Sequence, residues 1–248
     1  MLDKLNDTGA RVILLDIEGT TTPIAFVHET LFGYASMNLE VFLRENIAVP
    51  EVISCIEDMR MQHGDDVKNG RDPPPWPESS ALTDIDPAVS YGLWLISIDS
   101  KLPALKRLQG LMWEHGYRTG ELKSQVYEDV PDALRRWKSL GKEICIYSSG
   151  SAFAQRLIFG STQYGDLTIH IGGFFDTGVG TKTNPDSYRK IASLMGVPES
   201  GFLFFSDVGR ELDAAKEAGM GVCLVSRSQP VSQPVSGYPV IGSFREIE

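Results

Sequence analysis

With 248 residues, the chain is long enough to bury a large core, as one domain or as a main domain with an insertion. It holds 33 Asp and Glu against 23 Lys and Arg, and the resulting net charge of −10 disfavours binding to nucleic acid or anionic lipid. Its three cysteines show no metal-ligand spacing, and its first residues contain no apolar stretch of signal-peptide length. We therefore expect a cytoplasmic protein with reduced thiols.

Short apolar runs of strand length recur along the chain, and several end at Asp or Ser. They cover residues 12–15, 144–147, 202–205, 222–225 and 240–241. Because these runs show little polar alternation, they favour strands covered on both faces, as in a parallel sheet. Helical patterns near 133–140, 152–159, 185–195 and 211–218 lie between them, each followed by glycine. This alternation predicts an α/β fold with a doubly wound, Rossmann-like parallel sheet.

The stretch from residue 25 to 125 has a different pattern. Helical patterns cover residues 26–46, 52–62, 87–100 and 102–116, and no convincing strand lies among them. Asp72-Pro-Pro-Pro-Trp-Pro77 is typical of a stiff, extended connector. The simplest organisation is a catalytic core of residues 1–24 and 126–248, with an α-helical cap of residues 25–125 inserted after the first strand.

Two carboxylates follow the first apolar run. Asp16 comes directly after it, at the edge of a parallel sheet where ligands bind, and Glu18 follows two residues later, before a turn at Gly19. One carboxylate can attack phosphorus while the other gives and then removes a proton. The segment Thr20–Thr22 offers hydroxyl and backbone donors for a phosphate. The alternative is that both acids lie on the surface and only begin a turn.

Three other strand ends carry polar groups. Ser148 and Ser149 precede a helix start, where backbone N–H groups favour an anion, although a plain helix cap needs only one serine. Lys182 lies in a glycine-rich loop, where it can neutralise a phosphoryl group or be an ordinary solvated lysine. Asp207 suits Mg²⁺ or caps the next helix, and Glu211 suits the positive end of that helix. Together these groups meet the requirements of phosphoryl transfer to a carboxylate.

The order of these groups resembles the haloacid-dehalogenase superfamily of phosphohydrolases. The string Leu15-Asp-Ile-Glu-Gly-Thr-Thr-Thr-Pro-Ile24 has Glu where most of these phosphatases have a second Asp. With Tyr147-Ser-Ser-Gly-Ser151 and Leu105-Lys-Arg-Leu-Gln-Gly-Leu-Met-Trp113, it is similar to the enolase-phosphatase family of methionine salvage, also called acireductone synthases. The similarity extends from about Arg11 to Phe244.

The resemblance implies a substrate, a metal and a set of site residues. The substrate would be 2,3-diketo-5-methylthiopentyl-1-phosphate, which is enolised and then dephosphorylated to the acireductone. Asp16 would be the nucleophile and Glu18 the acid and base, and both would bind one Mg²⁺ per subunit together with Asp207. Ser148, Ser149 and Lys182 would contact the substrate phosphate. The family implies a monomer whose partner is a small-molecule phosphate, with no nucleic acid or membrane partner.

Two other functions remain open at this point. A related phosphatase for another metabolite, such as a sugar phosphate, would share the same motifs and differ only in the cap. A receiver-like signalling domain also has a phosphorylatable Asp beside Mg²⁺ and Lys, but it needs about half this length. Its Asp follows a middle strand in chain order, whereas here Asp16 ends the first strand and precedes a long cap. The enolisation base is also open: Glu18 is a candidate, with Mg²⁺ or Lys182 as the electrophile.

Overall fold

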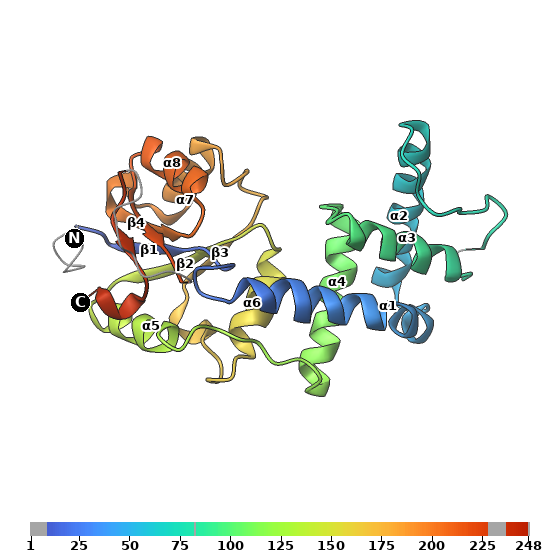
Figure 1. The fold of residues 1–248 in the computed structure, drawn as a ribbon, viewed down its shortest axis with the longest axis horizontal. Helices are drawn as coiled ribbons and strands as arrows, with labels where there is room; N and C mark the ends of the chain where they lie inside the picture. The colour runs from blue at the N-terminus through green and yellow to red at the C-terminus, as the bar shows by residue number, and fades with distance from the viewer. Residues whose placement is uncertain (1–8, 82, 228–236, 248) are drawn as a thin grey trace. The chain divides into compact units, whose positions relative to one another are not determined.

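A computed structural model describes residues 9–81, 83–227 and 237–247. Residues 1–8, for which the sequence predicts no signal peptide, lie outside the described residues. Residues 228–236, which belong to the predicted core, also lie outside them. The chain divides into two compact units, one of Met1–Val27 and Lys123–Glu248, the other of His28–Leu122 (Figure 1). The assignment of these units as catalytic core and cap remains a prediction.

The first unit contains a parallel sheet, and among the described residues this sheet has six strands in the order β3-β2-β1-β4-β5-β6 (Figure 1). The strands are β1 (Val12–Leu15), β2 (Glu143–Tyr147), β3 (Gly173–Phe175), β4 (Phe202–Ser206), β5 (Gly221–Val225) and β6 (Val240–Ile241). The predicted α/β class with a parallel sheet is confirmed. Strand β3 was not predicted, because three residues beginning with glycine form no recognisable apolar run.

Helices alternate with these strands. They are α5 (Val130–Ser139), α6 (Ala152–Gly160), η3 (Thr168–His170), α7 (Pro185–Met195), η4 (Glu199–Gly201), α8 (Gly209–Glu217) and η5 (Phe244–Glu246). Helix α7 begins where the sequence predicts, because the Asn184 side chain accepts a hydrogen bond from Asp186 N. It ends at Gly196, whose φ of 63° suits glycine.

Both faces of the sheet are covered. Val12 and Leu14 of β1 belong to a buried cluster with Tyr188 of α7, and α8 contributes to the same cluster. On the neighbouring strand β4, the ring of Phe205 stacks on Trp137 of α5 with a centroid distance of 5.8 Å. Burial on two sides explains why these strands are continuous apolar runs rather than alternating ones.

The second unit is built from helices around its own core. Its helices are α1 (Phe32–Asn46), α2 (Pro50–Lys68), α3 (Asp86–Ser97) and α4 (Pro103–Thr119), and the π-helix η2 (Phe26–Leu31) spans the boundary between the units. Leu39, Met59, Tyr91 and Leu108, one from each of the four helices, are buried in a single cluster. Within residues 28–81 and 83–122 the structure contains no strand.

None of the helices in the described part of the chain is both long enough and apolar enough to span a bilayer.

Candidate active site

Asp16 lies at the end of the central strand β1. Its backbone N–H donates to Phe205 O at 3.0 Å, which extends the parallel ladder by one residue and fixes the start of the following turn. The residue is 4% exposed. Lys182 Nζ lies 2.5 Å from Asp16 Oδ1, so the structure brings together two residues that are 166 positions apart in the sequence.

Lys182 contacts a second carboxylate as well. Its Nζ lies 2.5 Å from Glu211 Oε2, and Glu211 also accepts a hydrogen bond from Ser206 Oγ at 2.9 Å. Burial lowers the pKa of Lys182, but the negative charges of Asp16 and Glu211 outweigh burial and raise this pKa above its ordinary value. The site therefore holds a buried ammonium group in contact with two acids.

Two tyrosine hydroxyls hold the loop that carries Lys182. Tyr147 OH donates to Gly180 O at 2.9 Å, and Tyr188 OH donates to Lys182 O at 2.7 Å. Gly180 has a φ of 136°, and a Cβ there would lie 2.2 Å from Ser187 Oγ, so the loop requires glycine at this position. Sequence reasoning missed these supporting residues because an isolated tyrosine in an apolar stretch indicates only core packing.

Asp207 follows β4 and packs against the turn after Asp16. Its Oδ1 is buried and has no hydrogen-bond partner. Burial, together with the charge of Asp16, raises the pKa of Asp207 to about 6. Gly19, with a φ of 70°, contacts Asp207 closely: a Cβ on Gly19 would lie 2.1 Å from Asp207 Oδ2. The turn can therefore lie against this carboxylate only because residue 19 is glycine.

These features fit a small divalent cation. The unpartnered oxygen of Asp207 and its repulsion by Asp16 would both be relieved by a positive ion. Among the described residues, no group of three or more His, Cys, Asp or Glu side chains is arranged to hold a metal. Mg²⁺ requires only one or two carboxylates, because waters and phosphate oxygens complete its octahedron. Asp16 and Asp207 therefore suit Mg²⁺.

The turn after Asp16 is closed by its own hydrogen bonds. Thr21 Oγ1 donates to Asp16 O at 3.0 Å, and Thr22 N donates to Ile17 O at 2.9 Å. Glu18 is half-buried and forms an isolated bridge with Thr22. The Thr21 hydroxyl, expected from the sequence as a phosphate donor, is instead used inside the turn. The metal-binding and acid–base roles of Glu18 remain predictions.

Ser148 and Ser149 follow β2. Ser148 is buried, its N–H donates to Phe175 O at 3.1 Å, and its Oγ accepts from Gly150 N at 3.3 Å. Helix α6 is capped by Ser151, whose Oγ accepts from Ala154 N at 3.2 Å. The plain helix-cap explanation therefore applies to Ser151, and a phosphate-binding role of the two earlier serines remains a prediction.

Glu211 is the residue whose place in the site the sequence did not indicate. It lies on the first turn of α8, four residues after Asp207, where an acid is expected simply because it suits the positive end of the helix dipole. Its ion pair with Lys182 forms only because the fold brings helix α8 next to the loop before α7. The spacing from Asp207 was the only available signal.

Comparisons with known proteins identify relatives of the chain. A family model described as haloacid dehalogenase-like hydrolase matches residues 10–219. The chain is 40% identical over 237 residues to an enolase-phosphatase E1 of Pseudomonas aeruginosa, covering 96% of this chain and 97% of that protein. It is 44% identical over 242 residues to a probable bifunctional methylthioribulose-1-phosphate dehydratase/enolase-phosphatase E1 of Populus trichocarpa, covering 96% of this chain and 47% of that longer protein.

A solved structure shows the same relationship. The crystal structure of the UTR4 protein of Saccharomyces cerevisiae matches with a TM-score of 0.74 at 35% sequence identity, covering 95% of this chain and 99% of that one. The chain and the Pseudomonas aeruginosa protein align at 40% identity over nearly the full length of both. The chain therefore belongs to the enolase-phosphatase E1 family of haloacid dehalogenase-like hydrolases.

Proposed function

We propose that the chain is a Mg²⁺-dependent enolase-phosphatase that converts 2,3-diketo-5-methylthiopentyl-1-phosphate to 1,2-dihydroxy-3-keto-5-methylthiopentene and phosphate, in methionine salvage. The observation that carries the phosphatase chemistry is the buried contact of Lys182 with Asp16. The choice of substrate rests on relatives named enolase-phosphatase E1, one of which also carries the name of a methylthioribulose-1-phosphate dehydratase.

Asp16 is the nucleophile in this proposal. Its carboxylate attacks phosphorus in line. A P–O bond forms to Asp16 while the ester P–O bond of the substrate breaks. Lys182 pairs with Asp16 and neutralises the phosphoryl oxygens, which Ser148 and Ser149 also contact. Asp16 and Asp207 would hold Mg²⁺, which when bound supplies further charge neutralisation at the phosphoryl group.

Glu18 moves the protons. It protonates the leaving oxygen in the first half of the reaction and then removes a proton from the water that attacks the aspartyl-phosphate. A new P–O bond forms to this water as the P–O bond to Asp16 breaks, which releases phosphate and restores the carboxylate. A group with both tasks must change protonation state twice per turnover, and the half-buried position of Glu18 in the turn supports access to substrate and water.

Enolisation requires removal of a proton from the carbon next to a carbonyl. Glu18 is our candidate base, and Lys182 is the candidate electrophile that stabilises the enolate. Glu18→Gln is expected to abolish both phosphate release and solvent-deuterium exchange at that carbon, measured by NMR. Exchange at the wild-type rate in this variant would exclude Glu18 as the enolisation base.

We propose that the helical unit His28–Leu122, which lies within the predicted cap of residues 25–125, excludes water and selects the substrate. We further propose a monomeric, cytoplasmic enzyme whose partner is a small-molecule phosphate rather than nucleic acid or membrane. Size-exclusion chromatography with light scattering tests the monomer directly, since a dimer would double the mass of the 27.3 kDa chain.

The nucleophile is tested by trapping. After acid quenching of the reaction with ³²P-labelled substrate, the label is expected in the peptide that contains Asp16. Asp16→Asn is expected to lose both the label and turnover. Asp213→Asn is the matched control, because Asp213 is an exposed acid of α8 that bonds Tyr238 and not Lys182. An Asp16→Asn protein with wild-type turnover would rule out the assignment.

A further inference from the structure

Arg227 contacts the turn that carries Glu18. This arginine lies just after β5, and its side chain is only 9% exposed. Its Nε and Nη2 both donate to Thr20 O, at 3.0 and 2.7 Å. Thr20 is two residues after Glu18. A buried guanidinium from another part of the chain therefore hydrogen-bonds the backbone of this turn.

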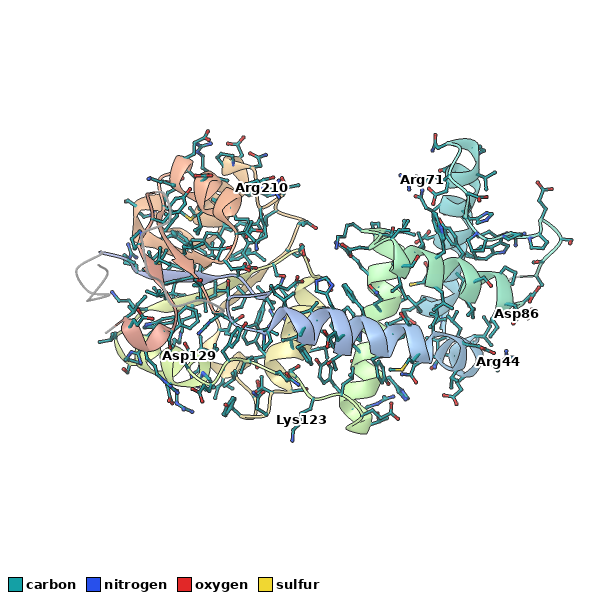
Figure 2. The ribbon with its side chains drawn as sticks, viewed as in Figure 1. Arg44, Arg71, Asp86, Lys123, Asp129 and Arg210 are labelled. Carbon is teal, nitrogen blue, oxygen red and sulfur yellow. The ribbon has the colours of Figure 1, made fainter. Side chains whose placement is uncertain are left out.

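Asp129 fixes the other side of the guanidinium. Arg227 Nη1 donates to Asp129 Oδ2 at 2.6 Å, and the same oxygen accepts from Ser243 Oγ at 2.7 Å and Phe244 N at 2.6 Å. Figure 2 shows Asp129 beside the C-terminal turn η5. The guanidinium carbon also lies 4.3 Å from the ring centroid of Tyr127. Charge-assisted bonds in a planar fork, packed against an aromatic ring, leave Arg227 little freedom.

The turn that contains Glu18 and Thr20 can move little. Gly19 N donates to Thr22 O at 2.9 Å, and Gly19 packs so closely on Asp207 that no Cβ fits between them. A shift of the Thr20 carbonyl would therefore move Gly19 relative to Asp207 and change the position of Glu18. Misplacement of catalytic groups by about 1 Å costs rate on the order of 100-fold.

We propose that Arg227, oriented by Asp129, is a positioning residue: it fixes the Thr20 carbonyl and thereby holds the turn bearing Glu18 against Asp207. This inference rests on the catalytic roles proposed for Asp16 and Glu18. Arg227 touches no substrate in this account. Its effect is on the geometry of the turn, so it acts on kcat more than on KM.

Two variants of Arg227 and one matched control test this role. Arg227→Met removes every donor while keeping much of the volume, and Arg227→Lys keeps the charge without the fork. The matched control is Arg136→Met: Arg136 Nη2 donates to Phe244 O and Ile247 O at 2.7 and 2.8 Å, so it also ties down the C-terminal segment, but it has no contact with the Thr20 turn. Steady-state kinetics are measured far below each unfolding midpoint and normalised to folded protein by circular dichroism.

We expect Arg227→Met to lower kcat at least about tenfold with KM changed less than about twofold. Arg227→Lys restores part of kcat, and Arg136→Met keeps wild-type kcat despite a comparable drop in the unfolding midpoint. Wild-type kcat in Arg227→Met would overturn the positioning role and leave a structural one. If Arg227→Met does not fold, Arg227→Lys and Asp129→Asn test the proposal instead. Wild-type kcat in both of these variants would overturn it.

Asp16→Asn is measured in parallel. Loss of turnover in Asp16→Asn, with unchanged turnover in the Arg227 variants, refutes only the positioning role. Retained turnover in Asp16→Asn refutes the proposed function itself.

Discussion

Lys182 Nζ lies 2.5 Å from Asp16 Oδ1, and both side chains are almost completely buried. Burial alone would favour a neutral lysine, so the charged pair persists only because each partner stabilises the charge of the other. Glu211, whose Oε2 also lies 2.5 Å from the ammonium, is a second acidic partner. Lys182 therefore lies in contact with two buried or half-buried carboxylates at once.

Lys182→Met is expected to lower the free energy of unfolding by about 3 kcal/mol, because two carboxylates would remain buried without their cation. Urea unfolding of the metal-free protein measures this change. Lys138→Met is the control: its pair with Glu143 has side chains 36% and 39% exposed, and such pairs contribute about 0–1 kcal/mol. Equal losses in the two variants would contradict a special role for the buried pair.

Mg²⁺ is expected to raise the unfolding temperature of the wild type at pH 8 and to leave Asp207→Asn unchanged, because binding to the folded state alone stabilises it. The response should weaken below pH about 6, the pKa of Asp207, since a protonated carboxyl is a poor ligand. Scanning calorimetry with and without EDTA measures both effects. An equal Mg²⁺ response in Asp207→Asn would place the ion elsewhere.

The raised pKa of Asp207 also predicts how the stability of the metal-free protein depends on pH. Because the folded-state pKa of Asp207 is raised, its carboxylate destabilises the folded protein as pH rises through about 6. Asp207→Asn without metal is therefore expected to be more stable than the wild type at pH 8. This advantage should shrink as pH falls below about 6 and vanish near the unfolded-state pKa of about 3.9. A variant less stable than the wild type at pH 8 would contradict the unpartnered, repelled state of this carboxylate.

Asp129 is expected to have the opposite pH dependence. Burial raises the pKa of Asp129, but hydrogen bonds from Arg227 and Ser243 and the charge of Arg227 outweigh burial and hold this pKa below its usual range. A lowered folded-state pKa stabilises the protein above the unfolded-state pKa of about 3.9, and this stabilisation is lost as pH falls further. As pH falls below about 4, urea unfolding should show a larger loss of stability in the wild type than in Asp129→Asn.

The sequence indicated those parts of the site where residue type and position coincide. Asp16 and Asp207 each follow a continuous apolar strand, and parallel strands present their carboxyl ends at one edge, so their approach followed from the pattern. Lys182 was predicted because a lysine in a glycine-rich loop suits a phosphate. Its contact with Asp16 required only that this loop lie at the same edge.

The parts that escaped prediction depend on tertiary contacts. Arg227 and Asp129 are 98 positions apart, and neither lies in a motif that suggests a partner. Glu211 resembles an ordinary acid in the first turn of a helix until its burial beside Lys182 is known. Strand β3 has only three residues and is defined by its pairing with β2, which no local periodicity records.

The most direct test of the account is a combined absorbance and phosphate-release assay with 2,3-diketo-5-methylthiopentyl-1-phosphate, with and without Mg²⁺. We expect a transient enol absorbance followed by phosphate release that requires Mg²⁺. Phosphate release from generic phosphate esters, with none from this compound, would contradict the enolase-phosphatase assignment and leave only the phosphatase chemistry of Asp16.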